Sequence, residues 1–127
     1  MELEIKHIAP YLPFRLKLNT EEGIVELNSI DTGLKMVNFG WGNAKELHEI
    51  KPLLYPKSHL YKLQDEMVAR WGQGLSGKSL EYWKQTLTAE MMQDDYNSIR
   101  YDFVQFMLEK NIDVFGLIPA GLAEEIK

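Results

Sequence analysis

The sequence contains no cysteine. This absence excludes disulfide bonds, zinc–thiolate sites, iron–sulfur clusters and a cysteine nucleophile, and it fits a reducing compartment. A chain of 127 residues does not depend on disulfide bonds, because it is long enough to bury a sizeable hydrophobic core.

A targeting pattern and long apolar runs are missing as well. Residues 1–6 lack the basic and apolar regions of a signal peptide. No apolar run in the sequence approaches the roughly 18 residues that a membrane-spanning helix needs. We therefore expect a soluble, cytoplasmic protein without membrane contacts.

An excess of positive charge is also missing. The formal net charge is −5; residues 1–57 carry seven basic against eight acidic side chains, and residues 58–127 carry seven against eleven. This balance disfavours nucleic acid as a partner, because nucleic-acid-binding proteins present basic surfaces to the phosphate backbone. Arg15 and Lys17 alternate with apolar residues, which leaves a nucleic-acid accessory role as an alternative.

The composition is that of a folded globular protein, with 45% hydrophobic and 26% charged residues and no repeats or low-complexity tracts. The length suits a single domain covering residues 1–127. The pattern changes near Pro56, so we expect a β-rich part at residues 1–56 and a helical part at residues 57–127.

Short runs of apolar residues before Pro56 predict β-strands. Period-2 alternation and turn residues place the strands at residues 14–18, 24–27, 34–39 and 46–54. The strands follow one another too closely for parallel crossovers, so the sheet is expected to be antiparallel. Pro52 should confine the last strand to an edge or to its own end.

Helical periodicity follows. Ser58 is a candidate N-cap for a first helix, Ser79 for a second, and Asp94 or Asp95 for a third. Residues 79–110 could instead form one long helix, because no glycine or proline interrupts residues 80–110. The inward-facing positions of the second helix are Leu80, Trp83, Leu87 and Met91.

These elements predict an α+β fold. A small N-terminal antiparallel sheet of three or four strands, which could curl into a barrel, precedes two to three helices. The tail at residues 122–126 could return to the edge of the sheet.

Residues 72–79, GQGLSGKS, match the letter pattern of a Walker A phosphate loop. In such a loop, Gly77 would contribute backbone N–H groups, Lys78 would reach the phosphates and Ser79 would hold magnesium. However, residues 65–71 read as a helix rather than a buried strand, and no later strand supplies a second magnesium ligand.

We interpret residues 72–79 as an exposed loop between helices, with Ser79 as an N-cap. The alternatives are a nucleotide-binding loop, or a looser anion site formed by Gly77, Lys78 and Ser79 at a helix N-terminus. No other pattern predicts a cofactor, a metal site or a catalytic residue, because the three histidines are scattered and no serine has a nucleophile-elbow context.

Trp41 lies between Gly40 and Gly42 and is a candidate partner-binding residue. A tryptophan between two glycines could stack on a ligand or anchor a partner, although we favour the interpretation that it plugs the open end of the sheet.

Three segments carry a family resemblance: HIAPYLPF (residues 7–14), EIKPLLYP (49–56) and NIDVFGLIPAGLA (111–123). In this order they resemble a family of small uncharacterised proteins of Bacteroides-type bacteria, their phages and integrated elements. The resemblance implies a phage- or mobile-element-associated cytoplasmic protein and supplies no catalytic residues. We expect a non-enzymatic accessory protein that contacts an unidentified protein partner, with an acidic helical face as the sharpest version of that hypothesis.

Overall fold

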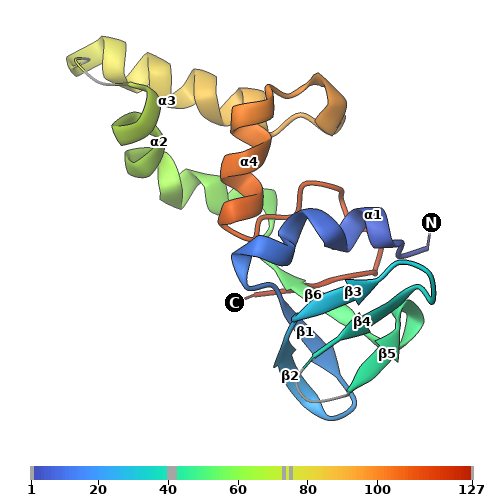
Figure 1. Cartoon of the computed structure of the whole chain (residues 1–127). Helices are drawn as coiled ribbons and strands as arrows, with labels where there is room; N and C mark the ends of the chain where they lie inside the picture. Colours follow the sequence, from blue (N-terminus) through green and yellow to red (C-terminus); the bar gives the residue numbers. More distant parts are fainter. Residues whose placement is uncertain (1, 40–42, 73, 75, 127) are drawn as a thin grey trace.

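The computed structural model describes residues 2–39, 43–72, 74 and 76–126. Small β-sheets form one end of the molecule and a helical arm forms the other, with α1 and the following turn lying across the sheets (Figure 1). One hydrophobic cluster includes residues from both parts. The α+β prediction is confirmed, with the sheets preceding the main helices. In chain order the elements, with 3₁₀-helices labelled η, are α1 (Ile5–Ile8), η1 (Ala9–Phe14), β1 (Lys17–Thr20), β2 (Gly23–Glu26), β3 (Ser29–Asp31), β4 (Met36–Asn38), β5 (Ala44–Glu46), η2 (Leu47–Glu49), β6 (Lys51–Leu54), η3 (Lys57–Leu63), α2 (Gln64–Trp71), α3 (Gly77–Met91), η4 (Tyr96–Ser98), α4 (Tyr101–Glu109) and β7 (Glu124–Glu125).

The strands form two sheets, and these do not close into a barrel. The first has the order β2-β1-β6-β7 and the second the order β3-β4-β5. Residues 23–31 contribute β2 to the first sheet and β3 to the second, and the Asn28 N–H donates to the Asn38 carbonyl where the sheets meet. All pairings are antiparallel except that of β6 with β7.

The prediction for Pro52 is wrong, because β6 lies inside its sheet between β1 and β7. In the pairing of β1 with β2, the Leu27 N–H donates to the Leu16 carbonyl. Every second residue of an antiparallel strand faces the same neighbour, so the N–H and carbonyl of Leu18 also point toward β2. Pro52 pairs with Leu18 and therefore occupies a position where β1 requires no N–H donor. The pairing of β6 with β7 begins one residue later, at Leu53.

Both ends of the predicted sheet differ from the expectation in detail. Residues 9–14 form η1, and Arg15, with φ of +57°, turns the chain before β1 begins at Lys17. The expected strand at residues 46–54 is interrupted by η2. The predicted return of the tail is confirmed, because Leu53 pairs with Glu124 in the parallel ladder.

The helices begin earlier than their predicted caps. Extended Pro56 precedes η3, which runs into α2, so Ser58 lies inside the helical segment. Extended Ser76 precedes α3, so Ser79 is the third residue of the helix and not its N-cap. Sequence reasoning chose the serine nearest the apolar stripe in each case, whereas the backbone becomes helical one turn or less before it.

Residues 79–110 do not form one long helix. α3 ends at Met91, and α4 begins at Tyr101. Asp95 caps the short η4 between them, accepting a hydrogen bond of 3.1 Å from the Asn97 N–H. The third helix, α4, begins after Arg100, so the prediction that Asp94 or Asp95 caps it is wrong. None of the described helices combines the length and apolarity needed to cross a bilayer.

The C-terminal hook, residues 111–123, joins the sheets to the helical arm. Tyr55, directly after β6, donates to the Asn111 carbonyl at 2.8 Å and accepts from the Asp113 N–H at 2.9 Å. The Tyr11 hydroxyl donates to the Ile112 carbonyl at 2.5 Å and accepts from the Val114 N–H at 3.0 Å. Residues 7–14 and 49–56, which carry two parts of the family resemblance, are therefore each hydrogen-bonded to the third part, residues 111–123.

We expect the stability of the protein to fall as the pH is lowered through about 6.5. Burial lowers the pKa of both His7 and His59 below the ordinary value of 6.5, and the charge of Lys62 lowers that of His59 further. The unfolded chain then binds more protons than the folded chain, so stability is complete above that value and is lost below it. Urea denaturation between pH 8 and about pH 5 measures the change.

The control is the His7→Asn variant, because the Nδ1 atom of His7 accepts a hydrogen bond from the Glu4 N–H that an asparagine oxygen can also accept. Its stability should depend less steeply on pH than that of the wild type. Equal slopes for the two proteins would contradict the assignment to His7.

Candidate functional site

The segment that matches the Walker pattern connects two helices. α2 ends at Trp71 and α3 begins at Gly77, while Gln73 and Leu75 lie outside the described residues. A phosphate loop instead follows a buried strand of a parallel sheet. Lys78 and Ser79 are exposed on the first turn of α3, and the local context is a helical hairpin (Figure 1).

Gly72 is a packing residue between the two helices. A Cβ atom built on Gly72 would lie 2.7 Å from Cδ1 of Trp83, which is too close for any side chain. The Trp83 indole donates to the Trp71 carbonyl at 3.3 Å, and the Gly72 N–H donates to the Val68 carbonyl. The first glycine of the pattern is thus explained by the contact between α2 and α3.

Gly72→Ala should therefore destabilise the protein by about 1–3 kcal/mol, because α2 and Trp83 must move apart. Gly33→Ala is the matched control: its added Cβ atom meets Asp31 at 3.4 Å, an ordinary contact, and the expected change is within about 0.5 kcal/mol. Urea denaturation of both variants measures the difference. An unchanged stability for Gly72→Ala would argue against this packing role.

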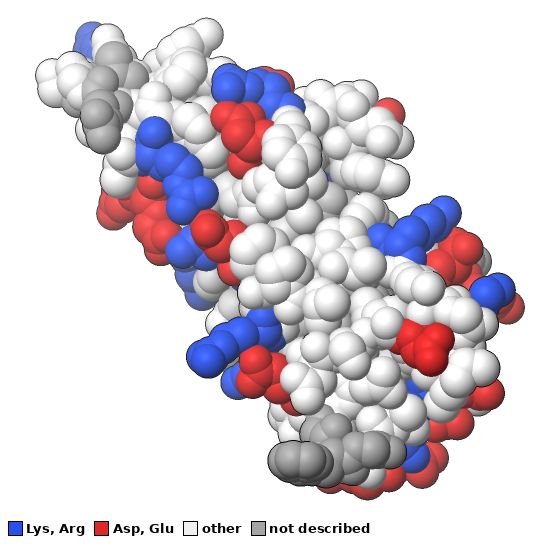
Figure 2. Space-filling model, in the orientation of Figure 1, with Lys and Arg blue, Asp and Glu red and all other residues white. Residues whose placement is uncertain are grey.

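The two other sequence candidates gain no site from the structure. Trp41 lies outside the described residues. Arg15 lies 3.7 Å from Glu26, and Figure 2 shows basic and acidic side chains interleaved on the face that it presents. The basic residues in and next to β1 therefore do not form a continuous positively charged surface for phosphate groups.

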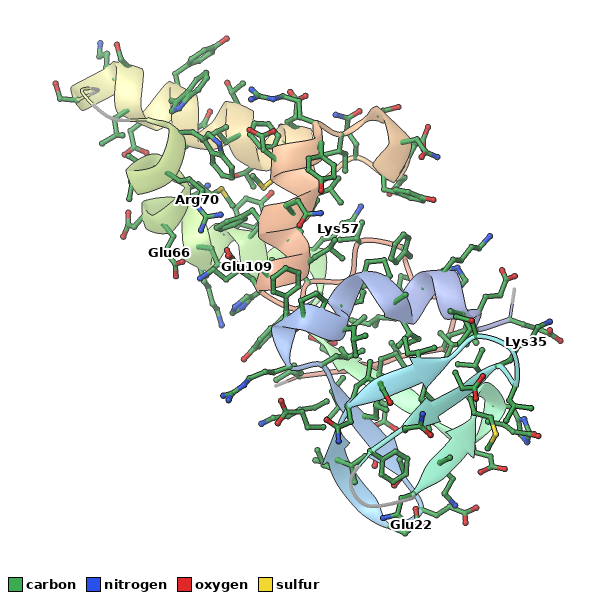
Figure 3. All side chains as sticks on the ribbon, in the orientation of Figure 1. Glu22, Lys35, Lys57, Glu66, Arg70 and Glu109 are labelled. Atoms are coloured by element: carbon green, nitrogen blue, oxygen red, sulfur yellow. The ribbon has the colours of Figure 1, made fainter. Side chains whose placement is uncertain are left out.

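Acidic residues of the helical arm are largely held in ion pairs. Lys84 contacts both Asp65 and Glu81, at 3.5 and 3.6 Å. Arg70 of α2 and Glu109 of α4 extend toward each other and meet at 2.9 Å (Figure 3). Lys110 pairs with Glu66 in the same way. These pairs bind the helices to one another and leave their charge locally balanced.

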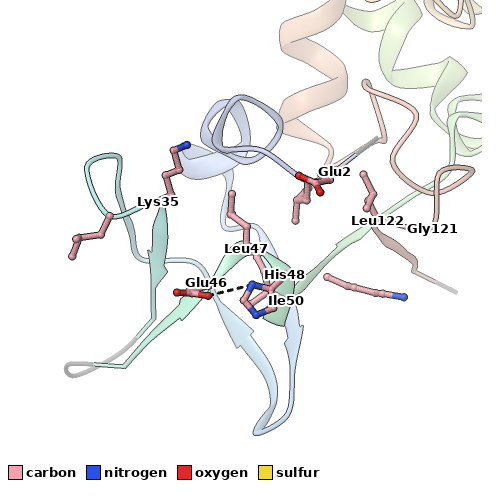
Figure 4. Close-up of a pocket in the computed structure, with 11 residues that line it drawn as sticks. Glu2, Lys35, Glu46, Leu47, His48, Ile50, Gly121 and Leu122 are labelled. Carbon is pink, nitrogen blue, oxygen red and sulfur yellow. Dashed lines mark ion pairs between the residues drawn. The ribbon is translucent and has the colours of Figure 1, made fainter.

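A hollow with a volume of about 630 Å³ lies on the sheet end of the molecule. We call it the sheet groove (Figure 4). Four segments that are distant in the sequence surround it: the residues before α1, the β3–β4 turn, the segment from β5 to β6 and the C-terminal hook. Its lining residues are Glu2, Leu3, Leu34, Lys35, Glu46, Leu47, His48, Ile50, Lys51, Gly121 and Leu122.

The floor of the sheet groove is apolar and continuous with the core. Ile50 is buried in the core cluster, and Leu3, Leu47 and Leu122 pack against that cluster. Leu34, at the tip of the β3–β4 turn, is 69% exposed, and its N–H is held by the Asp31 carboxylate at 3.0 Å. The backbone of Leu34 is thus held by Asp31, and its large apolar side chain is exposed where it lines the groove.

The rim carries charges of both signs. Glu46 lies 3.3 Å from the Nδ1 atom of His48. Among the described residues, Lys35 and Lys51 form no ion pair within 4.0 Å, unlike the basic residues of the helical arm discussed above. The groove therefore has lysine ammonium groups without an ion-pair partner among the described residues at its edge, and leucine side chains at its centre.

Glu46, His48 and Glu49 are the cluster whose donor atoms could surround a metal ion, since these atoms lie within 4.8 Å of one another. All three side chains are exposed, and His48 turns Nδ1 to Glu46 and Nε2 to Glu49. A histidine side chain that contacts two carboxylates accounts for this arrangement, so the cluster does not require an ion.

The chemistry of the lining residues is suited to binding. The residues that line the sheet groove include no hydroxyl or thiol side chain that could act as a nucleophile. Sequence reasoning did not identify this groove, because its walls come together only through tertiary contacts. The one local signal is Leu34, a large apolar residue that the sequence pattern places at the start of a strand and the structure places in the turn before β4.

Comparison of the chain with protein-family models, with curated proteins and with solved structures finds no match.

Proposed function

We propose that this protein is a non-enzymatic accessory protein that binds a segment of a partner protein in the sheet groove. The family resemblance of residues 7–14, 49–56 and 111–123 suggests a phage or mobile-element origin in a Bacteroides-type host. The observation that carries the proposal is the exposed Leu34, which lines a groove of about 630 Å³ with an apolar floor.

The dimensions and the lining favour a peptide segment as the occupant. The volume lies within the range of ligand sites. A partner residue with a large apolar side chain would cover Leu34 and the floor, which removes apolar surface from water on both sides. Acidic groups next to that residue would meet Lys35 and Lys51 at the rim.

This proposal moves the contact away from the acidic helical face expected from the sequence. The acidic side chains Asp65, Glu66 and Glu109 have basic neighbours within the helical arm. A partner would have to replace those ion pairs, and exposed pairs of this kind exchange with little net gain. The sheet groove requires no such exchange.

Leu34→Asp is the variant that tests the proposal. We expect it to abolish enrichment of a partner from a lysate of a Bacteroides-type host and to abolish binding of that purified partner in calorimetry. Ile24→Asp is the matched control, because Ile24 is 65% exposed on β2 and does not line the groove. Both variants should keep the circular-dichroism spectrum of the wild type.

Two outcomes would overturn the proposal. One is equal binding of a purified partner to wild type, Leu34→Asp and Ile24→Asp. The other is a thermal stabilisation by ATP or GTP with magnesium that disappears in Lys78→Ala, since a nucleotide at about 100 times its Kd stabilises a protein by about 2.7 kcal/mol. That second result would restore the nucleotide-binding alternative.

A further inference from the structure

The β3–β4 turn holds a lysine in a backbone conformation that lysine disfavours. Residues 32–35 connect β3 to β4, and Lys35, the last of them, has a φ of +55°. A side chain in this left-handed region lowers stability, so turns that need such a conformation favour glycine there. The turn does contain a glycine, Gly33, but its φ is not positive. The left-handed position is therefore occupied by Lys35.

Lys35 differs in its surroundings from the other left-handed residues. Among the described residues other than glycine, Arg15 and Asn111 also have a positive φ. Arg15 follows η1, and Asn111 comes shortly after α4. Helices commonly end on a left-handed residue, which accounts for both. Lys35 lies between two strands, so a helix end does not explain its conformation.

The residue before Lys35 is also placed unfavourably. Leu34 is 69% exposed, and Asp31 holds its N–H at 3.0 Å. An exposed leucine and a left-handed lysine thus follow one another in the turn, and both line the sheet groove. Backbone strain that the surrounding structure maintains is concentrated at binding sites and catalytic sites. The turn is therefore the part of the groove in which recognition of a partner is to be sought.

The positive charge of Lys35 is available to a partner. Among the described residues, no carboxylate forms an ion pair with its ammonium group. Glu46, which lines the same groove, contacts His48 at 3.3 Å instead. Glu2 lies on the side of the C-terminal hook, away from Lys35 (Figure 4). The turn side of the groove therefore presents an unpaired positive charge next to an exposed apolar side chain.

We propose that Lys35 is the specificity-determining residue of the sheet groove, and that it selects a partner segment with an acidic residue next to a large apolar residue. The inference rests on the proposed function and adds to it which segments the groove accepts. The apolar residue of the partner covers Leu34, and the neighbouring carboxylate pairs with Lys35. A basic residue at that place meets the Lys35 charge, and like charges brought together disfavour binding.

Lys51, the other lysine of the rim, is the matched control. It belongs to β6 and pairs with Asn19 of β1 in the regular ladder. The residue before it, Ile50, is buried in the core. A partner therefore finds an exposed leucine next to Lys35, whereas the residue that precedes Lys51 is already covered.

Thermal unfolding of two glycine variants tests the strain at Lys35. Lys35→Gly should raise the midpoint of unfolding by about 2–5 °C, because glycine adopts a positive φ without strain. Lys51→Gly should lower the midpoint, because glycine in a strand loses more conformational freedom on folding. A Lys35→Gly protein that is no more stable than the wild type would overturn the inference, because the turn would then hold Lys35 without strain.

Selection of random short peptides, displayed on phage, against the immobilised full chain tests the specificity. We expect the wild type to enrich peptides that carry an acidic residue directly beside a large apolar one. Lys35→Glu should bind a synthetic copy of such a peptide at least about tenfold more weakly in fluorescence anisotropy, and Lys51→Glu should weaken binding less. Selection against Lys35→Glu should enrich a basic residue at the same place.

The outcomes separate this inference from the proposed function. A selection that yields no peptide weakened by Leu34→Asp would count against the proposed function, and the inference would fall with it. Peptides that require Leu34 but bind wild type and Lys35→Glu equally would keep the groove as a binding site and overturn the role of Lys35. Enriched peptides without an acidic residue beside the apolar one would do the same. Circular dichroism establishes that each variant is folded.

Discussion

Asp113→Ala should lower the free energy of unfolding by about 2–4 kcal/mol. Asp113 is 3% exposed, and its two carboxylate oxygens accept hydrogen bonds of 2.8 Å from the N–H groups of Leu117 and Ile118. Alanine removes both acceptors and leaves the two backbone donors without partners. Urea denaturation at neutral pH measures the loss.

Asp95→Ala is the matched control for this variant. The Asp95 carboxylate also accepts a backbone N–H, that of Asn97, but Asp95 is exposed and water can replace it. The expected cost is therefore about 1 kcal/mol or less. Asp113→Asn, which keeps one acceptor oxygen, should fall between the wild type and Asp113→Ala. An equal loss of unfolding free energy in Asp113→Ala and Asp95→Ala would show that burial of the Asp113 carboxylate adds nothing to the strength of its hydrogen bonds.

Tyr11→Phe should lower the free energy of unfolding by about 2–3 kcal/mol, although it removes a single oxygen atom. Tyr11 is fully buried, and its hydroxyl bridges the Ile112 carbonyl and the Val114 N–H. Phenylalanine keeps the ring in place and leaves both backbone groups unsatisfied in the core. Chemical denaturation reports this loss, and the hook should also exchange its amide protons faster in the variant.

The control is Tyr101→Phe, which removes a hydroxyl from a side chain that is 77% exposed and should change stability by less than about 0.5 kcal/mol.

Alkaline pH offers a second test of the Tyr11 hydroxyl. Burial raises the pKa of the Tyr11 hydroxyl well above its usual value of 10.0. The unfolded chain then loses its proton first, so Tyr11 contributes to a loss of stability above about pH 10 that Tyr11→Phe should lack.

The inward-facing stripe of α3 could be predicted from the sequence. Leu87 and Met91 lie in the core as the helical spacing indicates, because apolar residues on one side of a helix must be covered. The return of the tail to β6 was also predictable. The helix boundaries were less so: Ser58 and Ser79 have the right chemistry for caps, but the backbone conformation of Pro56 and Ser76 decides where the helices begin.

The letter pattern at residues 72–79 illustrates why a motif depends on its surroundings. The sequence supplies the glycines, Lys78 and Ser79, but a phosphate loop also requires a strand before it, and α2 occupies that place. The close approach of Trp83 gives Gly72 a structural reason that no local pattern reveals.

The sequence by itself determined the α+β class, the absence of cysteine chemistry, the acidic charge and the inward stripes of the helices, because these depend on composition and on local periodicity. The tertiary structure decided where the β3–β4 turn meets the C-terminal hook and where η3 meets α3. The sheet groove exists only because residues far apart in the chain, such as Leu34 and Leu122, are brought together by packing and by the hydrogen bonds of Tyr11 and Tyr55.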